Sequence, residues 1–107
     1  MSIPNIEEIR AITKQRNEND IQDYMNKERT AIINGIQQDA RSGHSCHIHT
    51  WMDTTKTTLA TRSSHNFKKA LELLQKEFQE AGYEFQIDYV TTPVQNQTRI
   101  SDVVISW

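Results

Sequence analysis

The hydrophobic period changes at Gly82, and this change constrains the fold more than any other feature of the sequence. Before the glycine, apolar residues recur at helical spacing, which predicts an amphipathic helix over residues 64–81. After it, apolar and polar residues alternate, which predicts a strand over residues 83–90 with one buried face. Glycine readily adopts the left-handed conformation that ends a helix. We therefore expect a helix, a glycine stop and a strand in direct succession.

The remaining segments complete an α+β layout. Residues 44–52 alternate like a strand, and residues 99–107 are expected to close a hairpin with the strand at 83–90. Apolar residues at helical spacing predict one N-terminal helix, or two helices over about 4–17 and 20–41. The second option arises because Asn17-Glu18-Asn19-Asp20 interrupts the apolar pattern. We expect a three-stranded sheet with helices on one face.

Composition indicates one domain in a reducing compartment. The chain has 107 residues, enough for a single domain over 1–107, in which residues 1–18 are a candidate helical arm. A formal net charge of −2 disfavours general binding to nucleic acids. A single cysteine forms no internal disulfide, and no apolar run approaches the ~20 residues of a membrane span. We expect a cytoplasmic protein without membrane contact.

The expected sheet leaves surface for a partner. Three strands have two open edges, and one layer of helices covers only one of the two faces. Such edges and faces are often closed by another subunit. We therefore expect a homo-oligomer.

Three short motifs mark the joints of this layout: Ala40-Arg41-Ser42-Gly43 before the first strand, Ala81-Gly82-Tyr83 after the helix, and Ile105-Ser106-Trp107 at the end. In this order they resemble a loose group of short proteins encoded by tailed bacteriophages, over roughly residues 30–107. The group is mostly uncharacterised. The resemblance implies an α+β architecture, a phage setting and action in the host cytoplasm, and it assigns no role to any residue.

One stretch, Ser42–Trp51, holds three of the four histidines, the only cysteine and one of the two tryptophans. Alternation along a strand divides it between two faces. The apolar set is expected to face the helices, with the cysteine buried: Cys46, Ile48 and Met52. The other set is expected on the open face, beside Glu84 and Asp88 of the hairpin: His47, His49 and Trp51.

Two chemical interpretations of this stretch remain secondary. His47 and His49 lie two residues apart on one face and could share a metal ion with Asp88 or Glu84, although solvent-facing or interface-facing histidines are the favoured interpretation. A metal-dependent hydrolase is kept as an alternative on the same grounds. Two-histidine phosphodiesterase motifs are absent, and Cys46 lacks a partnered base on its own face. We expect no cofactor and no catalytic residue.

The favoured interpretation is a binding surface for a flat ligand or a protein. Trp51 and the histidines can stack on a ring or anchor a partner, and Arg62 offers charge nearby. The candidate binding residues are His47, His49, Trp51, Arg62, Glu84 and Asp88. With the phage resemblance, they predict a non-enzymatic accessory protein of the anti-defence type, which sequesters a host nucleotide signal or blocks a host protein. The alternative is a phage virion or assembly component.

Overall fold

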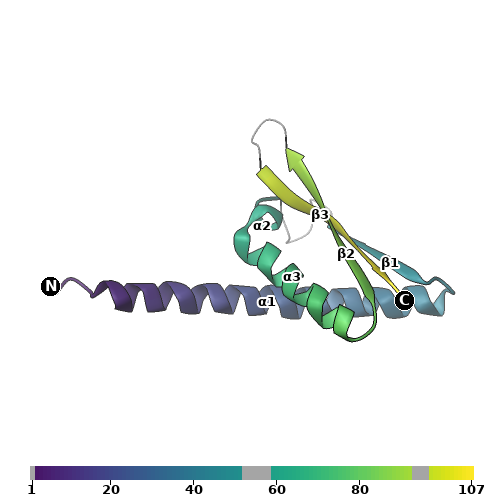
Figure 1. Cartoon of the computed structure of the whole chain (residues 1–107), viewed down its shortest axis with the longest axis horizontal. Helices are drawn as coiled ribbons and strands as arrows, with labels where there is room; N and C mark the ends of the chain where they lie inside the picture. Colours follow the sequence, from purple (N-terminus) through teal and green to yellow (C-terminus); the bar gives the residue numbers. More distant parts are fainter. Residues whose placement is uncertain (1, 52–58, 93–96) are drawn as a thin grey trace.

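A computed structural model describes residues 2–51, 59–92 and 97–107, and its architecture is α+β as predicted (Figure 1). The elements follow in the order α1 (Ile6–Arg41), β1 (Cys46–Thr50), α2 (Leu59–Ser63), α3 (His65–Glu80), β2 (Glu84–Thr92) and β3 (Gln97–Ser106). The long helix α1 and the shorter α3 lie on the same side of the three-stranded sheet. Helix α2 was not predicted, because its segment follows a threonine-rich stretch that resembles a polar connector.

The last strand of the chain, β3, occupies the centre of the sheet. The strand order is β1-β3-β2, and β3 runs antiparallel to both neighbours. The core lies between the sheet and the helices. Its buried residues are Met25, Ile32 and Ile36 of α1, Phe67, Ala70, Leu71, Leu74 and Phe78 of α3, and Phe85, Ile100, Val103 and Ile105 of the sheet.

The two ends of α3 follow from its sequence. Ser64 caps the first turn, and its Oγ accepts a hydrogen bond from the backbone N–H of Phe67. Gly82 ends the helix with φ of 100°, a left-handed conformation that favours glycine. The predicted succession of helix, glycine stop and strand is confirmed.

Helix α1 is one continuous helix of 36 residues, so the two-helix option was wrong. The polar residues expected to break it bond to each other along the helix. Gln15 donates from Nε2 to Asn19 Oδ1 at 3.0 Å, and Arg16 Nε lies 3.2 Å from Asp20 Oδ1. Such pairs four residues apart support a helix, and no glycine or proline stands among them.

The first part of α1 projects away from the rest of the molecule (Figure 1). We call residues 2–16 the N-terminal arm. Every residue from Ser2 to Asn19 is exposed, and the longest dimension of the molecule is 64 Å. The radius of gyration is 16.8 Å, whereas a globular chain of this length would have about 13 Å. None of the helices in the described ranges has the length and apolar character needed to cross a membrane.

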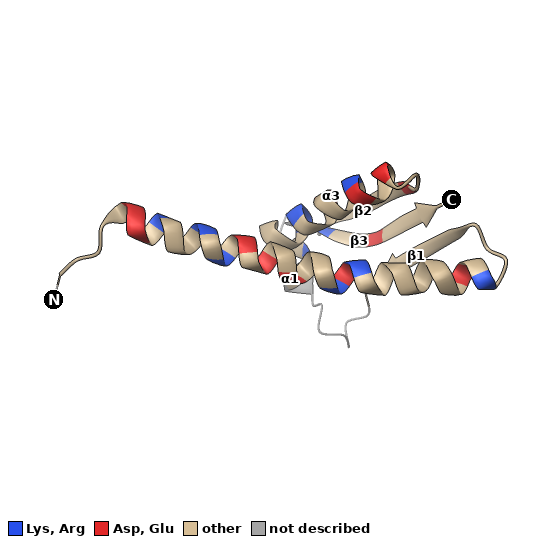
Figure 2. Ribbon diagram, turned by 90° about the horizontal axis from the view of Figure 1, so that it is seen from below, with Lys and Arg blue, Asp and Glu red and all other residues tan. Residues whose placement is uncertain are grey.

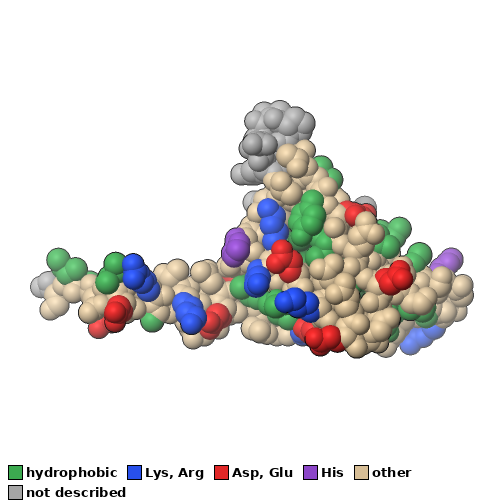
Figure 3. All heavy atoms as spheres, viewed as in Figure 1, with side chains coloured by type: hydrophobic (Ala, Val, Ile, Leu, Met, Phe, Trp, Pro, Cys, Tyr) green, Lys and Arg blue, Asp and Glu red, His purple; other side chains and the backbone are tan. Residues whose placement is uncertain are grey.

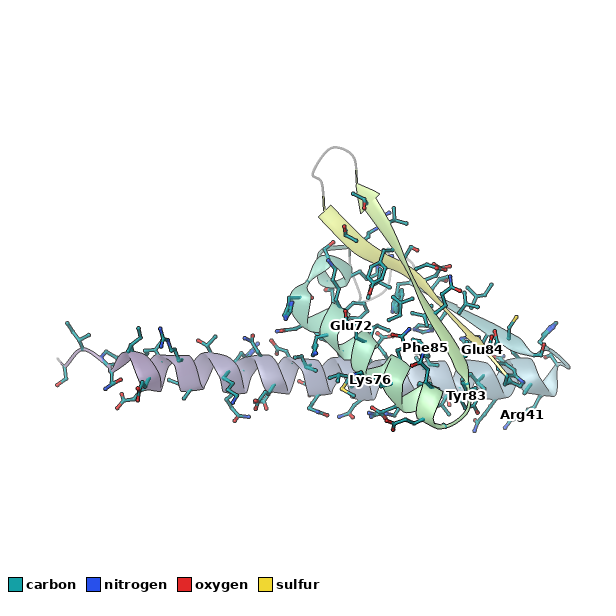
Figure 4. All side chains as sticks on the ribbon, in the orientation of Figure 1. Arg41, Glu72, Lys76, Tyr83, Glu84 and Phe85 are labelled. Atoms are coloured by element: carbon teal, nitrogen blue, oxygen red, sulfur yellow. The ribbon has the colours of Figure 1, made fainter. Side chains whose placement is uncertain are left out.

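An irregularity in the hairpin sets the environment of one tyrosine. The register between β2 and β3 shifts between Asp88 and Tyr89. Burial raises the pKa of the Tyr89 phenol above its ordinary value of 10.0, and the negative charge of Glu72 on α3 raises it further. Figure 4 shows Glu72 on the helix that covers this part of the sheet.

Replacing Tyr89 by phenylalanine should make stability less sensitive to alkali. Because the folded-state pKa is raised, the tyrosine's contribution is fully present below pH 10.0 and is lost as the pH rises through 10.0 and then through the folded value. Urea unfolding at a series of pH values should show the wild type losing stability faster than Tyr89→Phe above about pH 10. A parallel decline of the two proteins would contradict the expectation. Glu72→Gln should move the phenolate absorbance titration to lower pH.

Candidate functional site

The histidine-tryptophan row, His47, His49 and Trp51, faces helix α1 and not the open face of the sheet. His47 stands opposite Ile105 and His49 opposite Val103, and both of these β3 residues are fully buried on the helix side. The predicted orientation of the strand was therefore wrong.

The other set of β1 side chains points to the open face. Cys46, Ile48 and Thr50 are exposed, so the expected burial of Cys46 is also wrong. The reason lies outside the strand. Helix α1 carries two carboxylates that accept hydrogen bonds from the ring N–H groups of the row, and apolar residues alone do not decide which face is buried.

The first carboxylate belongs to Glu28, which is 2% exposed. One of its oxygens, Oε2, accepts from His49 Nε2 at 2.8 Å and from Trp51 Nε1 at 3.1 Å. A buried carboxylate requires such partners, because its desolvation is costly when they are missing. The Glu28 carboxylate therefore fixes two of the three rings.

The second carboxylate belongs to Asp39, whose Oδ2 lies 2.6 Å from His47 Nδ1. On its other side, the His47 ring lies against Gly35 of α1, and a Cβ atom built on that glycine would overlap the imidazole. His47 Nε2 is buried without a hydrogen-bond partner among the described residues. Gly35 therefore permits the close approach of helix and strand.

The rings form a continuous series that leads into the core. The His49 and Trp51 centroids are 4.8 Å apart in a T-shaped arrangement, and Trp51 meets Phe67 of α3 at 5.5 Å. Phe67 in turn meets Tyr24 of α1 edge-on at 5.5 Å. Edge-to-face pairs of this kind add to the stability gained from burial. The series joins β1, α1 and α3.

Gly35→Ala should destabilise the protein by about 1–3 kcal/mol, because the added methyl group displaces the His47 ring and its bond to Asp39. Propensity alone predicts the opposite sign, since alanine is better than glycine in a helix interior by roughly 1 kcal/mol. Urea unfolding measures the difference. Asn34→Ala, at the neighbouring exposed position, is the control and should be neutral or slightly stabilising. A stabilised Gly35→Ala protein would contradict the close approach.

The six predicted binding residues do not form one site. Glu84 and Asp88 lie on the open face, where Glu84 stands opposite Ser106 and Asp88 opposite Asp102. The sheet separates them from the row, so the alternative in which these carboxylates share a metal ion with His47 and His49 is wrong. Arg62 of α2 is 5% exposed, and its Nη1 donates to the Ile100 carbonyl at 3.5 Å. The threonine-rich segment 54–58 with Lys56 lies outside the described residues.

The row has the character of a structural contact. Its imidazoles are held by α1, and Cys46 points to the other face. Within residues 2–51, 59–92 and 97–107, no three His, Cys, Asp or Glu side chains converge as metal ligands. Nothing in this arrangement presents a nucleophile with its base to a substrate. The candidate functional surface lies elsewhere.

Two adjoining hollows of about 340 Å³ each form a groove along the C-terminal half of α1. Ile36, Gln37, Ala81 and Tyr83 line both hollows. Figure 4 shows Tyr83 where α3 passes into β2, beside α1. We call this feature the α1–α3 groove, and its other lining residues are Arg29, Ile33, Ala40, Glu77, Phe78, Gly82 and Trp107. Sequence reasoning missed it, because it arises from elements that only the fold brings together. Trp107, one of its lining residues, is 42% exposed.

The second candidate surface is the apolar side of the N-terminal arm. Four isoleucines are exposed there, with fractions of 94% for Ile3, 62% for Ile6, 47% for Ile9 and 66% for Ile12. Figure 3 shows hydrophobic side chains along the projecting arm. Soluble proteins seldom leave several large apolar residues together in water without a binding role.

Comparisons of the chain with models of known protein families, with curated proteins and with solved structures found no match.

Proposed function

We propose that this chain is a non-enzymatic, phage-type accessory protein that acts in the host cytoplasm by binding another protein through its N-terminal arm. The observation that carries the proposal is the row of exposed isoleucines on the projecting arm: Ile3 ahead of helix α1, and Ile6, Ile9 and Ile12 on the helix. The phage setting rests on the resemblance of residues 30–107 to short phage proteins.

The arm has the form of a helix that docks into a groove. At 100° per residue, Ile6, Ile9 and Ile12 span about 120° around the helix axis, the width of one apolar face. Charged residues of both signs are also distributed along the arm (Figure 2). Such a helix binds by placing its apolar face in a hydrophobic groove of a partner. The arm is held in helical form because it continues the anchored half of α1.

The geometry favours protein binding over nucleotide sequestration. The His49 and Trp51 rings, expected to stack on a flat ligand at the open face, instead face α1 and donate their N–H groups to Glu28 inside the molecule. Binding a nucleotide there would leave a buried carboxylate unpaired. A thermal-shift screen against nucleotide second messengers should therefore leave the melting temperature unchanged. A rise in melting temperature, with the nucleotide recovered intact, would favour nucleotide sequestration over protein binding.

A virion or assembly component is the second candidate. It is favoured by the presence of an apolar arm and an apolar groove on the same chain, since repeated subunits use such complementary surfaces to assemble. A component of this kind should be present in purified phage particles at a fixed copy number.

Photo-crosslinking tests the arm directly. A photoreactive amino acid at Ile9 should give one dominant adduct with a partner protein in cells, whereas the same amino acid at Ala11 should give little. Ala11 is the matched control because it lies about 160° from Ile9 around the same exposed helix. Equal labelling from both positions, or none from Ile9, would contradict the proposal.

A further inference from the structure

We propose that the partner of the arm is a second copy of this chain and that the copies join head to tail: the N-terminal arm of one protomer lies in the α1–α3 groove of the next. This inference rests on the proposed function, because it names the partner of the same arm. The contact is heterologous, which means that each protomer gives its arm to one neighbour and receives the arm of another.

The exposed apolar side chains gather on the arm and at the groove. Nine large apolar residues are exposed in the part of the chain that the structure describes, and six of them belong to these two surfaces. The six are Ile3, Ile6, Ile9 and Ile12 of the arm and Ile33 and Trp107 of the groove. Joining arm to groove therefore removes most of this apolar surface from water, which is the main favourable term in association.

The arm cannot reach the groove of its own chain. Both belong to the continuous helix α1, and Ile9 is 27 residues before Ile36 of the groove. At 1.5 Å per residue, these positions are about 40 Å apart along a straight axis. An occupant of the groove that comes from the arm must therefore come from another molecule.

Arm and groove also face opposite sides of α1. With 3.6 residues per turn, Ile9 lies about 180° from Ile36 and about 140° from Ala40 around the helix axis. One neighbour cannot contact both surfaces of a straight helix, so two protomers cannot exchange their arms reciprocally. A protomer whose arm is held by one neighbour therefore keeps its groove free for another.

The arm fits the groove in length. Its helical part, from Ile6 to Arg16, is about 15 Å long, and α1 lines the groove from Arg29 to Ala40, about 16 Å. Every residue of the arm is exposed, so no other element of the chain has to move before the arm enters a groove. Laying the apolar face of a helix into an apolar groove is a common form of recognition between proteins.

The charges at the two ends of α1 are complementary. The first turn of the helix contains Glu7 and Glu8, and its last turn contains Arg41, which follows the groove residue Ala40. All three charged side chains are exposed. An arm that lies in the groove with its first turn toward Arg41 gains a favourable charge contact, and the partial charges of the two helix ends act in the same direction.

Light scattering coupled to size-exclusion chromatography tests head-to-tail joining on the full chain, at concentrations from about 1 μM to about 1 mM. The wild-type mass should come to exceed twice the 12.5 kDa of one chain. Ile9→Lys with Ile12→Lys should give a monomer, with the dissociation constant raised on the order of 100-fold. The control, Ala11→Lys with Glu18→Gln, makes the same change in net charge on the opposite side of the arm and should assemble like the wild type. A wild type that stays monomeric, or whose mass stops at two chains, would overturn the inference.

Mixing two variants with different defects separates head-to-tail joining from a general loss of folding. Ile33→Lys alters an edge of the groove that is 38% exposed and leaves the arm intact, so it should be monomeric alone. Mixed with the arm variant, it should form a heterodimer through the one intact arm and the one intact groove. This heterodimer should not grow, because its remaining arm and its remaining groove are both defective. Absence of the heterodimer, or growth beyond two chains, would contradict the proposal.

The photo-crosslink at Ile9 distinguishes the failure of this inference from the failure of the proposed function. An adduct between two copies, mapped to residues 29–40 or 77–83 of the second copy, supports both. An adduct between copies that maps elsewhere overturns the groove as the place of binding. An adduct with a different protein, together with a monomeric wild type, leaves the proposed function standing and overturns the second copy as partner. If Ile9 gives no adduct at all, both statements fall.

Discussion

Replacing Glu28 by alanine should lower the free energy of unfolding by about 3 kcal/mol. The carboxylate is 2% exposed and accepts from both His49 and Trp51, so its removal leaves two donors without a partner in a poorly hydrated place. Each such donor costs about 1–3 kcal/mol. Urea unfolding followed by far-ultraviolet circular dichroism measures the loss.

Two further variants show whether the loss comes from the missing hydrogen-bond acceptor at position 28. Glu28→Gln keeps a carbonyl oxygen as acceptor and should lose less stability than Glu28→Ala. Glu8→Ala removes the same side chain from the exposed arm and should change stability by less than about 0.5 kcal/mol. If Glu28→Ala unfolds at the same urea concentration as Glu8→Ala, the Glu28 network does not hold β1 to α1.

Phe67→Ala should cost about 4 kcal/mol, the range of a deleted core aromatic side chain. Phe67 is fully buried, and its ring meets Tyr24 on α1 and Trp51 just after β1. The substitution opens a cavity where three elements meet. Because domains of this size are stable by roughly 5–15 kcal/mol, much of the total is lost.

A smaller substitution at the same position distinguishes a loss of packing from a protein that fails to fold. Phe67→Leu keeps most of the volume and should cost less than about 1.5 kcal/mol. Val90→Ala, at a site 40% exposed, should change stability little. Tryptophan fluorescence of folded Phe67→Leu should also differ from wild type, because Trp51 loses an aromatic neighbour. Equal stability of Phe67→Ala and Val90→Ala would contradict this account of the core.

Local rules predicted the C-terminal half of the fold. The amphipathic spacing of α3 and the glycine at 82 each act over one or two helical turns, so they can be read from a short window. The helix break near Asn19 was wrong because polar residues without glycine or proline bond to each other along a helix.

The orientation of β1 could not be read from the strand itself. Cys46 and Ile48 look more apolar than His47 and His49, but Glu28 and Asp39 lie far away in the sequence and satisfy the rings on the helix side. A signal was present in α1. Gly35 is unfavourable in a helix interior, and such a glycine often marks a close backbone approach. The groove was missed for the same reason, since it arises from elements brought together only by the fold.

The central position of β3 has a consequence for the order of folding during synthesis. Cys46 pairs with Ser106, which lies 60 positions later in the sequence, whereas β1 and β2 do not pair with each other. A ribosome therefore produces both outer strands before the strand that joins them. Until β3 is made, Glu28 and the rings of β1 lack the sheet that encloses them, and the nascent chain has an anchored helix pair at most. Such late, long-range pairing slows folding and exposes apolar surface in the meantime.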